Sequence, residues 1–262
     1  MGLALHWFGK NIAHYLSQDR HIHGTATITP PESLRAALRV GDVLLVEGGS
    51  RVSTAIKFLT QSTWSHAALY VGDQLVDRQG NKANHYFVEV DMEEGVRSVG
   101  IEKFAGLHTR ICRPVGLDEA GCRQVADYAI ARIGHRYDLR NIVDIARYLL
   151  PTPPVPSRFR RQMLALGSGD PTRAICSTMI AQAFQSVRYP ILPVVDKRSA
   201  DSPDCPGCIE EIYRLRHHSL FTPRDFDVSP YFKIIKPMLE DGFDFKSLKW
   251  EEIMNAEQVR ST

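Results

Sequence analysis

The chain has 262 residues, of which 44% are hydrophobic and 24% are charged. These proportions are close to the averages for folded globular proteins and disfavour both a disordered chain and a membrane-spanning class. The 32 basic and 30 acidic residues leave a formal net charge of +2, which provides no overall field to attract nucleic acid. We expect one main domain with a proper hydrophobic core.

The cysteines and the N-terminus together predict a cytoplasmic location. Five cysteines are an odd number, and their uneven spacing does not resemble the disulfide framework of a small secreted domain. The first residues lack the basic, apolar and cleavage regions of a signal peptide, and no apolar stretch approaches the ~18 residues of a membrane span. The cysteines are Cys112, Cys122, Cys176, Cys205 and Cys208.

Residues 1–30 are predicted to form an N-terminal helix and a linker. Apolar residues recur every three to five positions through 2–18, which indicates an amphipathic helix. Docking of this helix on the domain is favoured over a membrane surface, because Lys10 is the only firm positive charge before Arg20. Peripheral membrane association remains the alternative.

The next part of the chain, up to residue 114, predicts a cluster of antiparallel strands with two short helices. Asp42 is interpreted as a turn former whose carboxylate binds local backbone. The Gly72-Asp73 turn predicts a β-hairpin between the strands on either side of it. The expected helices are 31–38 and 52–60, and the expected strands are 43–47, 66–71, 74–77, 86–91, 96–99 and 110–114.

From Asp118 onward the pattern becomes helical, with Asp118 as N-cap and Gly134 as the stop of the first helix. Four prolines between 151 and 156 cannot continue a helix or a central strand, so a loop insertion is expected around 151–170. The predicted main domain spans 31–235, followed by a tail at 236–262. The expected helices are 118–134, 141–150, 158–166 and 175–187, followed by a polar segment at 189–218 and a short apolar run at 231–235.

His66 and Cys176 are candidates for a catalytic pair. His66 begins an apolar strand, and Cys176 lies 110 residues downstream in the first turn of a predicted helix. Backbone N–H groups and the helix dipole stabilise a thiolate there, and a nearby imidazolium lowers the thiol pKa further. A single buried cysteine is more often a small core residue, so spacing alone leaves both interpretations open.

Five short motifs, in this order and spacing, resemble the permuted NlpC-type papain-like cysteine hydrolases, the YiiX/YaeF-like group. They are Val40-Gly41-Asp42-Val43-Leu44-Leu45, Trp64-Ser65-His66 with Val71-Gly72, Val88-Glu89-Val90, Gly134-His135-Arg136-Tyr137-Asp138 and Ile175-Cys176-Ser177. In that family the histidine strand precedes the cysteine helix, the reverse of papain. The resemblance implies an α+β, circularly permuted papain-like fold, with an antiparallel sheet or small barrel packed against the cysteine helix and its neighbours.

The resemblance also implies a thiol hydrolase of amidase or peptidase type that works through an acyl-enzyme, without a metal or organic cofactor. Cys176 would be the nucleophile and His66 the base. Glu89 would orient the histidine from a neighbouring strand, with His85, Asp91 and Asp77 as substitutes. The expected substrates are cell-wall peptides or related amides. A lipid-directed acyl hydrolase or acyltransferase and a non-catalytic binding domain of the same fold are the alternatives, and the oligomeric state is left open.

Two further sets of residues carry weaker signals. Trp64 and Tyr137 are candidate substrate-binding residues, although a tyrosine in such a position is more often part of the core. Cys205 and Cys208 have zinc-ligand spacing. The histidines that follow them, His217 and His218, are adjacent and begin only nine positions on, against the ~12–15 residues of a zinc-finger pattern. An unmetallated surface loop is therefore expected there.

Overall fold

The computed structural model describes residues 29–75, 87–91, 94–135, 175–199, 209–237 and 244–247. The helices in these ranges are α2 (Pro31–Ala37), α3 (Arg51–Thr60), α4 (Glu119–Ile130), α7 (Ile175–Ser186) and α8 (Pro223–Asp227), with 3-10 turns η1 (Ile101–Phe104), η2 (His218–Leu220) and η3 (Phe245–Ser247). The strands are β1 (Val43–Val46), β2 (His66–Tyr70), β3 (Phe87–Asp91), β4 (Gly95–Val99), β5 (Thr109–Pro114), β6 (Val194–Ser199), β7 (Ile209–Arg214) and β8 (Phe232–Ile235). The helices expected at 2–18, 141–150 and 158–166, the insertion around 151–170 and most of the tail lie outside the described residues.

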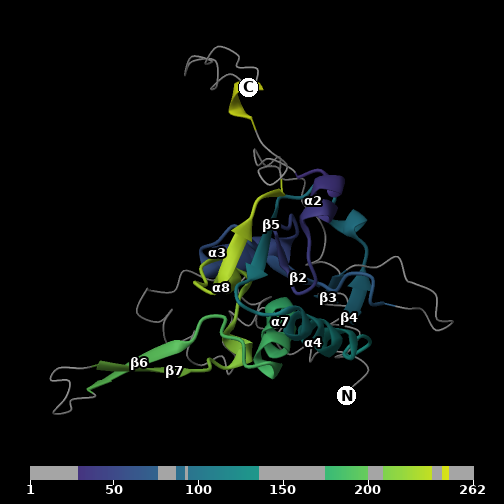
Figure 1. Cartoon of the computed structure of the whole chain (residues 1–262). Coiled ribbons are helices and arrows are strands. Elements are labelled where there is room, and N and C mark those ends of the chain that lie inside the picture. The colour runs from purple at the N-terminus through teal and green to yellow at the C-terminus, as the bar shows by residue number, and fades with distance from the viewer. Residues whose placement is uncertain are drawn as a thin grey trace, which may run out of the picture.

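The centre of the fold is a six-stranded antiparallel sheet in the order β4-β3-β2-β1-β5-β8. Strand β8, predicted only as an apolar run, pairs with β5 at one edge, and β4 forms the other edge. The described sheet is therefore open, so the predicted antiparallel sheet is confirmed and the small barrel is wrong for this part of the chain. The ribbons show helices packed on this sheet, which confirms the α+β class (Figure 1).

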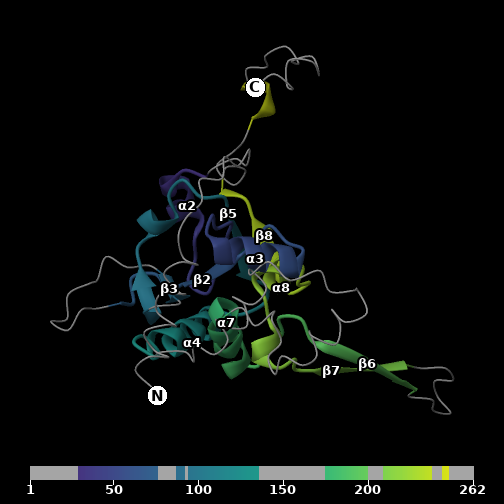
Figure 2. The same ribbon diagram turned by 180° about the vertical axis from the view of Figure 1, so that it is seen from behind.

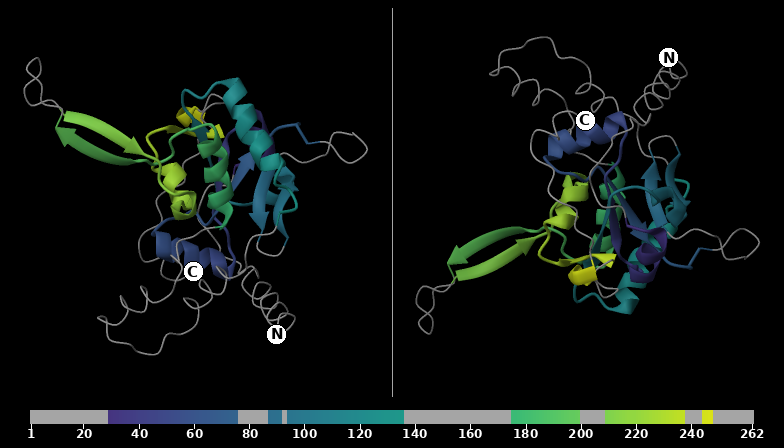
Figure 3. Two further views of the ribbon diagram at one scale, coloured as in Figure 1. Left: turned by 90° about the horizontal axis from the view of Figure 1, so that it is seen from below. Right: turned by 90° about the horizontal axis from the view of Figure 1, so that it is seen from above.

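Both faces of the sheet are covered, and each has its own apolar cluster. On one face, alternate residues such as Leu45, Leu69 and Val88 pack with Met179 and Phe184 of α7. On the other face, the intervening residues pack with α2 and η1. Helices α4 and α7 contact each other and lie side by side against the sheet (Figures 1 and 3). Because β1 is buried on both faces, its sequence is an unbroken apolar run rather than an alternating one.

The predicted hairpin between 66–71 and 74–77 is wrong for residues 74 and 75, the part of its second strand that the structure describes. Gly72 does adopt a positive φ of 63° in a turn, but Gln74 and Leu75 belong to no strand. Strand β2 pairs with β1 on one side and with β3 on the other. Both of its hydrogen-bonding edges are thereby occupied, so no third strand can join it.

The segment predicted as polar at 189–218 instead contains a two-stranded antiparallel ribbon, β6 paired with β7. The ribbon extends away from the sheet in every view (Figures 1, 2 and 3). Val194 is 50% exposed and Tyr213 56% exposed, so neither face of the ribbon shows the in-and-out alternation that marks a half-buried strand. That is why the sequence pattern did not indicate it.

Two local expectations are confirmed. Asp118 caps α4 by accepting a hydrogen bond from the Gly121 backbone N–H at 2.7 Å. Asp42 accepts a hydrogen bond from the Arg39 backbone N–H at 2.8 Å. The same carboxylate also binds Arg113 of β5 at 2.9 and 2.8 Å, so this turn is tied to the sheet that carries the candidate site.

Candidate active site

His66 and Glu89 lie together on one face of the sheet. The register pairs Ala68 with Glu89, which makes Glu89 a diagonal cross-strand neighbour of His66. His66 Nε2 lies 2.8 Å from Glu89 Oε2, and the Glu89 side chain is 0% exposed. The structure thus places the predicted orienting carboxylate beside the predicted base.

Cys176 comes to the same histidine from the helix side. It is the second residue of α7, where the positive end of the helix dipole stabilises a negative charge. The His66 ring and the Ala67 backbone lie close enough to the thiol to lower its pKa, and Ser177 Oγ lies 3.9 Å from the sulfur. Cys176, His66 and Glu89 therefore form one continuous chain of contacts.

For His66, Cys176 and Glu89, the effect of their mutual contacts on the pKa values outweighs the opposing effect of burial. Burial by itself lowers the pKa of His66, but the hydrogen bonds to Cys176 and Glu89 and their charges raise it to about 10. Burial likewise raises the pKa of the Cys176 thiol, whereas the hydrogen bond and charge of His66 bring it below its ordinary value. The pKa of Glu89 is raised by burial and lowered more strongly by His66 and Lys103, so its net shift is downward. The arrangement favours a thiolate, an imidazolium and a carboxylate together.

Of the alternatives for the orienting role, only Asp91 belongs to the described residues. Asp91 Oδ2 pairs with Arg97 Nη2 at 2.9 Å. Asp77 and His85 lie outside the described residues, as does the candidate substrate-binding residue Tyr137.

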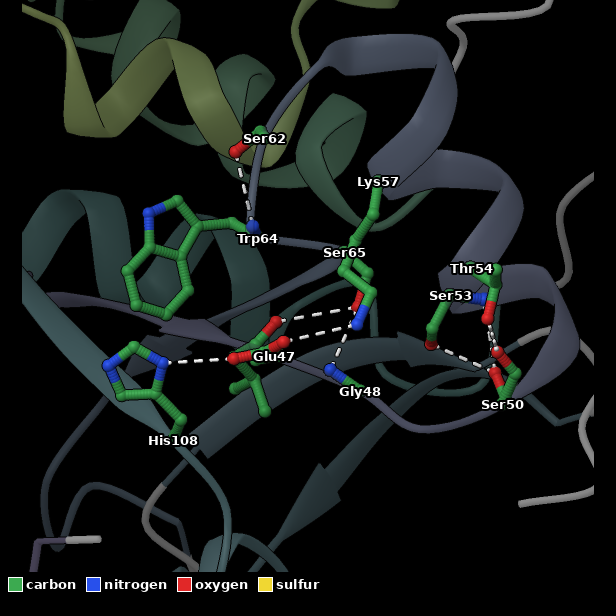
Figure 4. A network of polar contacts seen from close by, with 11 residues as sticks. Glu47, Gly48, Ser50, Ser53, Thr54, Lys57, Ser62, Trp64, Ser65 and His108 are labelled. Atoms are coloured by element: carbon green, nitrogen blue, oxygen red, sulfur yellow. Dashed lines mark hydrogen bonds and ion pairs between the residues drawn. The ribbon is translucent and has the colours of Figure 1, made fainter. Parts of the chain in front are cut away.

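Trp64 is part of a separate polar network next to the start of β2. Its ring is 2% exposed, and its Nε1 donates to Asp227 Oδ2 at 3.0 Å. The ring also lies 5.0 Å from that of His108. Figure 4 shows the Glu47 carboxylate between His108 and Lys57, with contacts of 3.0 and 3.2 Å. Trp64 is therefore packed in the core. Its role in substrate binding stays a prediction.

Two residues that the sequence did not single out complete the surroundings of Glu89. Arg97 Nε donates to Glu89 Oε1 at 3.0 Å, and Lys103 Nζ contacts the same oxygen. Arg97 lies directly opposite Glu89 in the β3–β4 register. The sequence could have indicated this contact, because opposite charges on neighbouring antiparallel strands often pair. Lys103 reaches the site from η1, and no spacing rule connects it to β3.

Neither a metal cluster nor a membrane span is found in the described part of the chain. Within it, no group of three His, Cys, Asp or Glu side chains is arranged to hold a metal ion. None of the helices described is both long and apolar enough to cross a membrane. Cys205 and Cys208 lie outside the described residues, while the rings of His217 and His218 are 4.1 Å apart.

The fold and the site define an α+β protein in which the histidine strand precedes the cysteine helix. Residues 37–148 match the model of a family described as permuted papain-like amidase enzyme, YaeF/YiiX, C92 family. This match confirms the resemblance predicted from the motifs and supports an amidase-like enzyme. It includes His66 and Glu89 and ends before Cys176.

The chain is similar to a solved structure described as metalloprotein yiiX from Escherichia coli O157:H7, at 15% identity and a TM-score of 0.43, covering 76% of this chain and 96% of that one. No curated protein matches the chain.

Proposed function

We propose that this protein is a thiol hydrolase of amidase or peptidase type, with Cys176 as nucleophile, His66 as acid and base, and Glu89 as the group that orients His66. The single observation that carries the proposal is that His66 lies 2.8 Å from the buried Glu89 carboxylate and close enough to the Cys176 thiol for each of the two to shift the pKa of the other. The match to a family of amidase enzymes supports the reaction class. Cell-wall peptides or related amides are the proposed substrates, and the cytoplasm is the proposed location.

In the proposed reaction the Cys176 thiolate attacks the carbonyl carbon of the substrate and forms a tetrahedral oxyanion. The Cys176 backbone N–H at the start of α7 would donate to that oxyanion. His66, as imidazolium, gives its proton to the leaving amine as the C–N bond breaks, which leaves a thioester on the sulfur. Neutral His66 then takes a proton from water, which attacks the thioester and releases the carboxylic acid and the thiolate.

The first prediction is that iodoacetamide labels Cys176 faster than Cys112 or Cys122 near neutral pH. The thiolate is the reactive form, and burial raises the pKa of both Cys112 and Cys122, whereas that of Cys176 is lowered. Brief treatment followed by mass mapping of peptides measures the order. Faster labelling of the less buried Cys122 would contradict the proposal, and preferential labelling of Cys205 or Cys208 would support a redox or metal role for that loop.

The second prediction is that Glu89→Gln lowers turnover by roughly 10²-fold, because the imidazole loses the charge that orients it and stabilises its protonated form. The loss should be smaller than that of Cys176→Ala, since the nucleophile remains. The pKa of His66 should fall, because an adjacent negative charge favours imidazolium.

Hydrolysis of p-nitrophenyl acetate across pH measures both effects of Glu89→Gln. Glu47→Gln is the matched control, because Glu47 also binds a histidine, His108 at 3.0 Å, in a different network. Equal pH profiles for Glu89→Gln and the unmodified protein would remove Glu89 from the proposed mechanism and move the orienting role to Asp91 or His85.

A further inference from the structure

The buried Glu89 carboxylate uses its two oxygens for different partners. Oε2 faces His66 at 2.8 Å. Oε1 accepts from Arg97 at 3.0 Å and also contacts Lys103. A buried carboxylate is costly unless it is paired and hydrogen-bonded, and here the two cations leave Oε2 to the histidine.

Arg97 is itself held in place by three carboxylates. Its Nε donates to Glu89, its Nη2 lies 2.9 Å from Asp91 Oδ2, and its Nη1 lies 2.9 Å from Glu94 Oε1. A guanidinium with every nitrogen engaged is fixed in orientation. Lys103 approaches the same oxygen from the other element, η1, with a side chain that is 37% exposed.

We propose that Arg97 and Lys103 are positioning residues for the hydrolase site: they fix the Glu89 carboxylate with Oε2 on His66 and offset part of its negative charge. The inference rests on the proposed function. Each cation would then influence the pKa of His66. That pKa determines how readily His66 gives its proton to the leaving group.

The charged groups around this carboxylate come from β2, β3, β4, η1 and α7 and from the turn that holds Glu94. His66 faces it from β2, Arg97 from β4 and Lys103 from η1. Asp91 and Glu94 act on it through Arg97. The Cys176 thiol, on α7, lies beyond His66. Substitution of Lys103 leaves Arg97 on Oε1, so the carboxylate stays in place and the change in charge is isolated.

The test is an NMR titration of the His66 ring in protein labelled with ¹⁵N-histidine, in a Cys176→Ala background. Removing the thiol takes away one of the groups that raise the pKa of His66, which brings the titration toward an accessible pH range. Adding Lys103→Met should raise the pKa of His66 by about one unit, because the cation on Glu89 Oε1 no longer offsets the carboxylate charge or repels the imidazolium. Lys103→Arg should restore the original value.

Glu102→Gln is the matched control, because Glu102 is the neighbour of Lys103 in η1 and pairs at the surface with Arg35 at 3.4 Å. It should leave the His66 titration unchanged. If Lys103→Met does not fold, Lys103→Gln makes the same change in charge with a polar side chain. A lower melting temperature with an unchanged or lower pKa of His66 would overturn the proposal and leave Lys103 a purely structural role.

The titration requires no turnover, so this inference and the proposed function fail separately. Slow alkylation of Cys176 in the unmodified protein would count against the hydrolase whatever Lys103 does. Rapid alkylation of Cys176 together with an unchanged pKa of His66 in Lys103→Met would remove only the role proposed for Lys103.

Discussion

Cys176→Ala should abolish formation of an acyl-enzyme and lower turnover of an activated ester or amide by at least about 10⁴-fold, because the covalent route requires the sulfur. The residue sits in the first turn of α7, and its thiol is the one among the described cysteines whose pKa is lowered by His66. Incubation with p-nitrophenyl acetate and intact-mass measurement should show one added acyl group on the unmodified protein and none on the variant.

Cys122→Ala is the matched control for this experiment. Cys122 is also a free thiol on a helix, α4, and its pKa is raised by burial. This variant should acylate and turn over like the unmodified protein. Cys176→Ser, with nearly the same side-chain volume, should fold normally and remain inactive, which separates loss of the nucleophile from a packing defect. An acyl group that persists in Cys176→Ala would place the nucleophile elsewhere.

The parts of the site that were predicted from the sequence each had a local signal. The apolar run after His66 indicated a strand, and the helical spacing after Cys176 placed the thiol in a first turn; both are confirmed as elements. The alternation around Glu89 also placed its side chain on the face opposite Val88 and Val90, and those valines indeed pack in the cluster on the other side of the sheet. Periodicity was sufficient for these features because each depends on neighbours in the chain.

What the sequence did not predict depends on which segments meet in space. The pairing of β2 with β3 replaced the expected hairpin, since the 66–70 strand found its partners at 43–46 and 87–91. Lys103 reaches Glu89 from a 3-10 turn 14 positions away, and its approach is set by the packing of η1 on the sheet. Local patterns contain no information on such contacts, so only the structure could connect Lys103 with the site.

His66→Gln should slow alkylation of Cys176 at neutral pH by about 10- to 100-fold. Burial raises the pKa of this thiol, and the hydrogen bond and charge of His66 are the main effects that bring it down. Without the imidazolium, burial is no longer offset. Below the thiol pKa, each unit of increase lowers the thiolate fraction tenfold. The rate of iodoacetamide labelling as a function of pH measures the change directly.

Turnover should fall at both low and high pH. As the pH falls through the lowered pKa of Cys176, the thiolate is protonated and turnover is lost. As the pH rises through about 10, His66 loses its proton and can no longer protonate the leaving amine, so turnover is lost again. In His66→Gln the acid limb of the labelling profile should move to higher pH.

His108→Gln is the control that matches His66→Gln most closely. His108 also contacts a carboxylate, Glu47 at 3.0 Å, but belongs to the network around Trp64. Its loss should leave the labelling profile of Cys176 in place. If His66→Gln and His108→Gln gave the same profile as the unmodified protein, the low thiol pKa would have to come from the helix dipole and the Ala67 N–H alone, and His66 would have no part in activating the nucleophile.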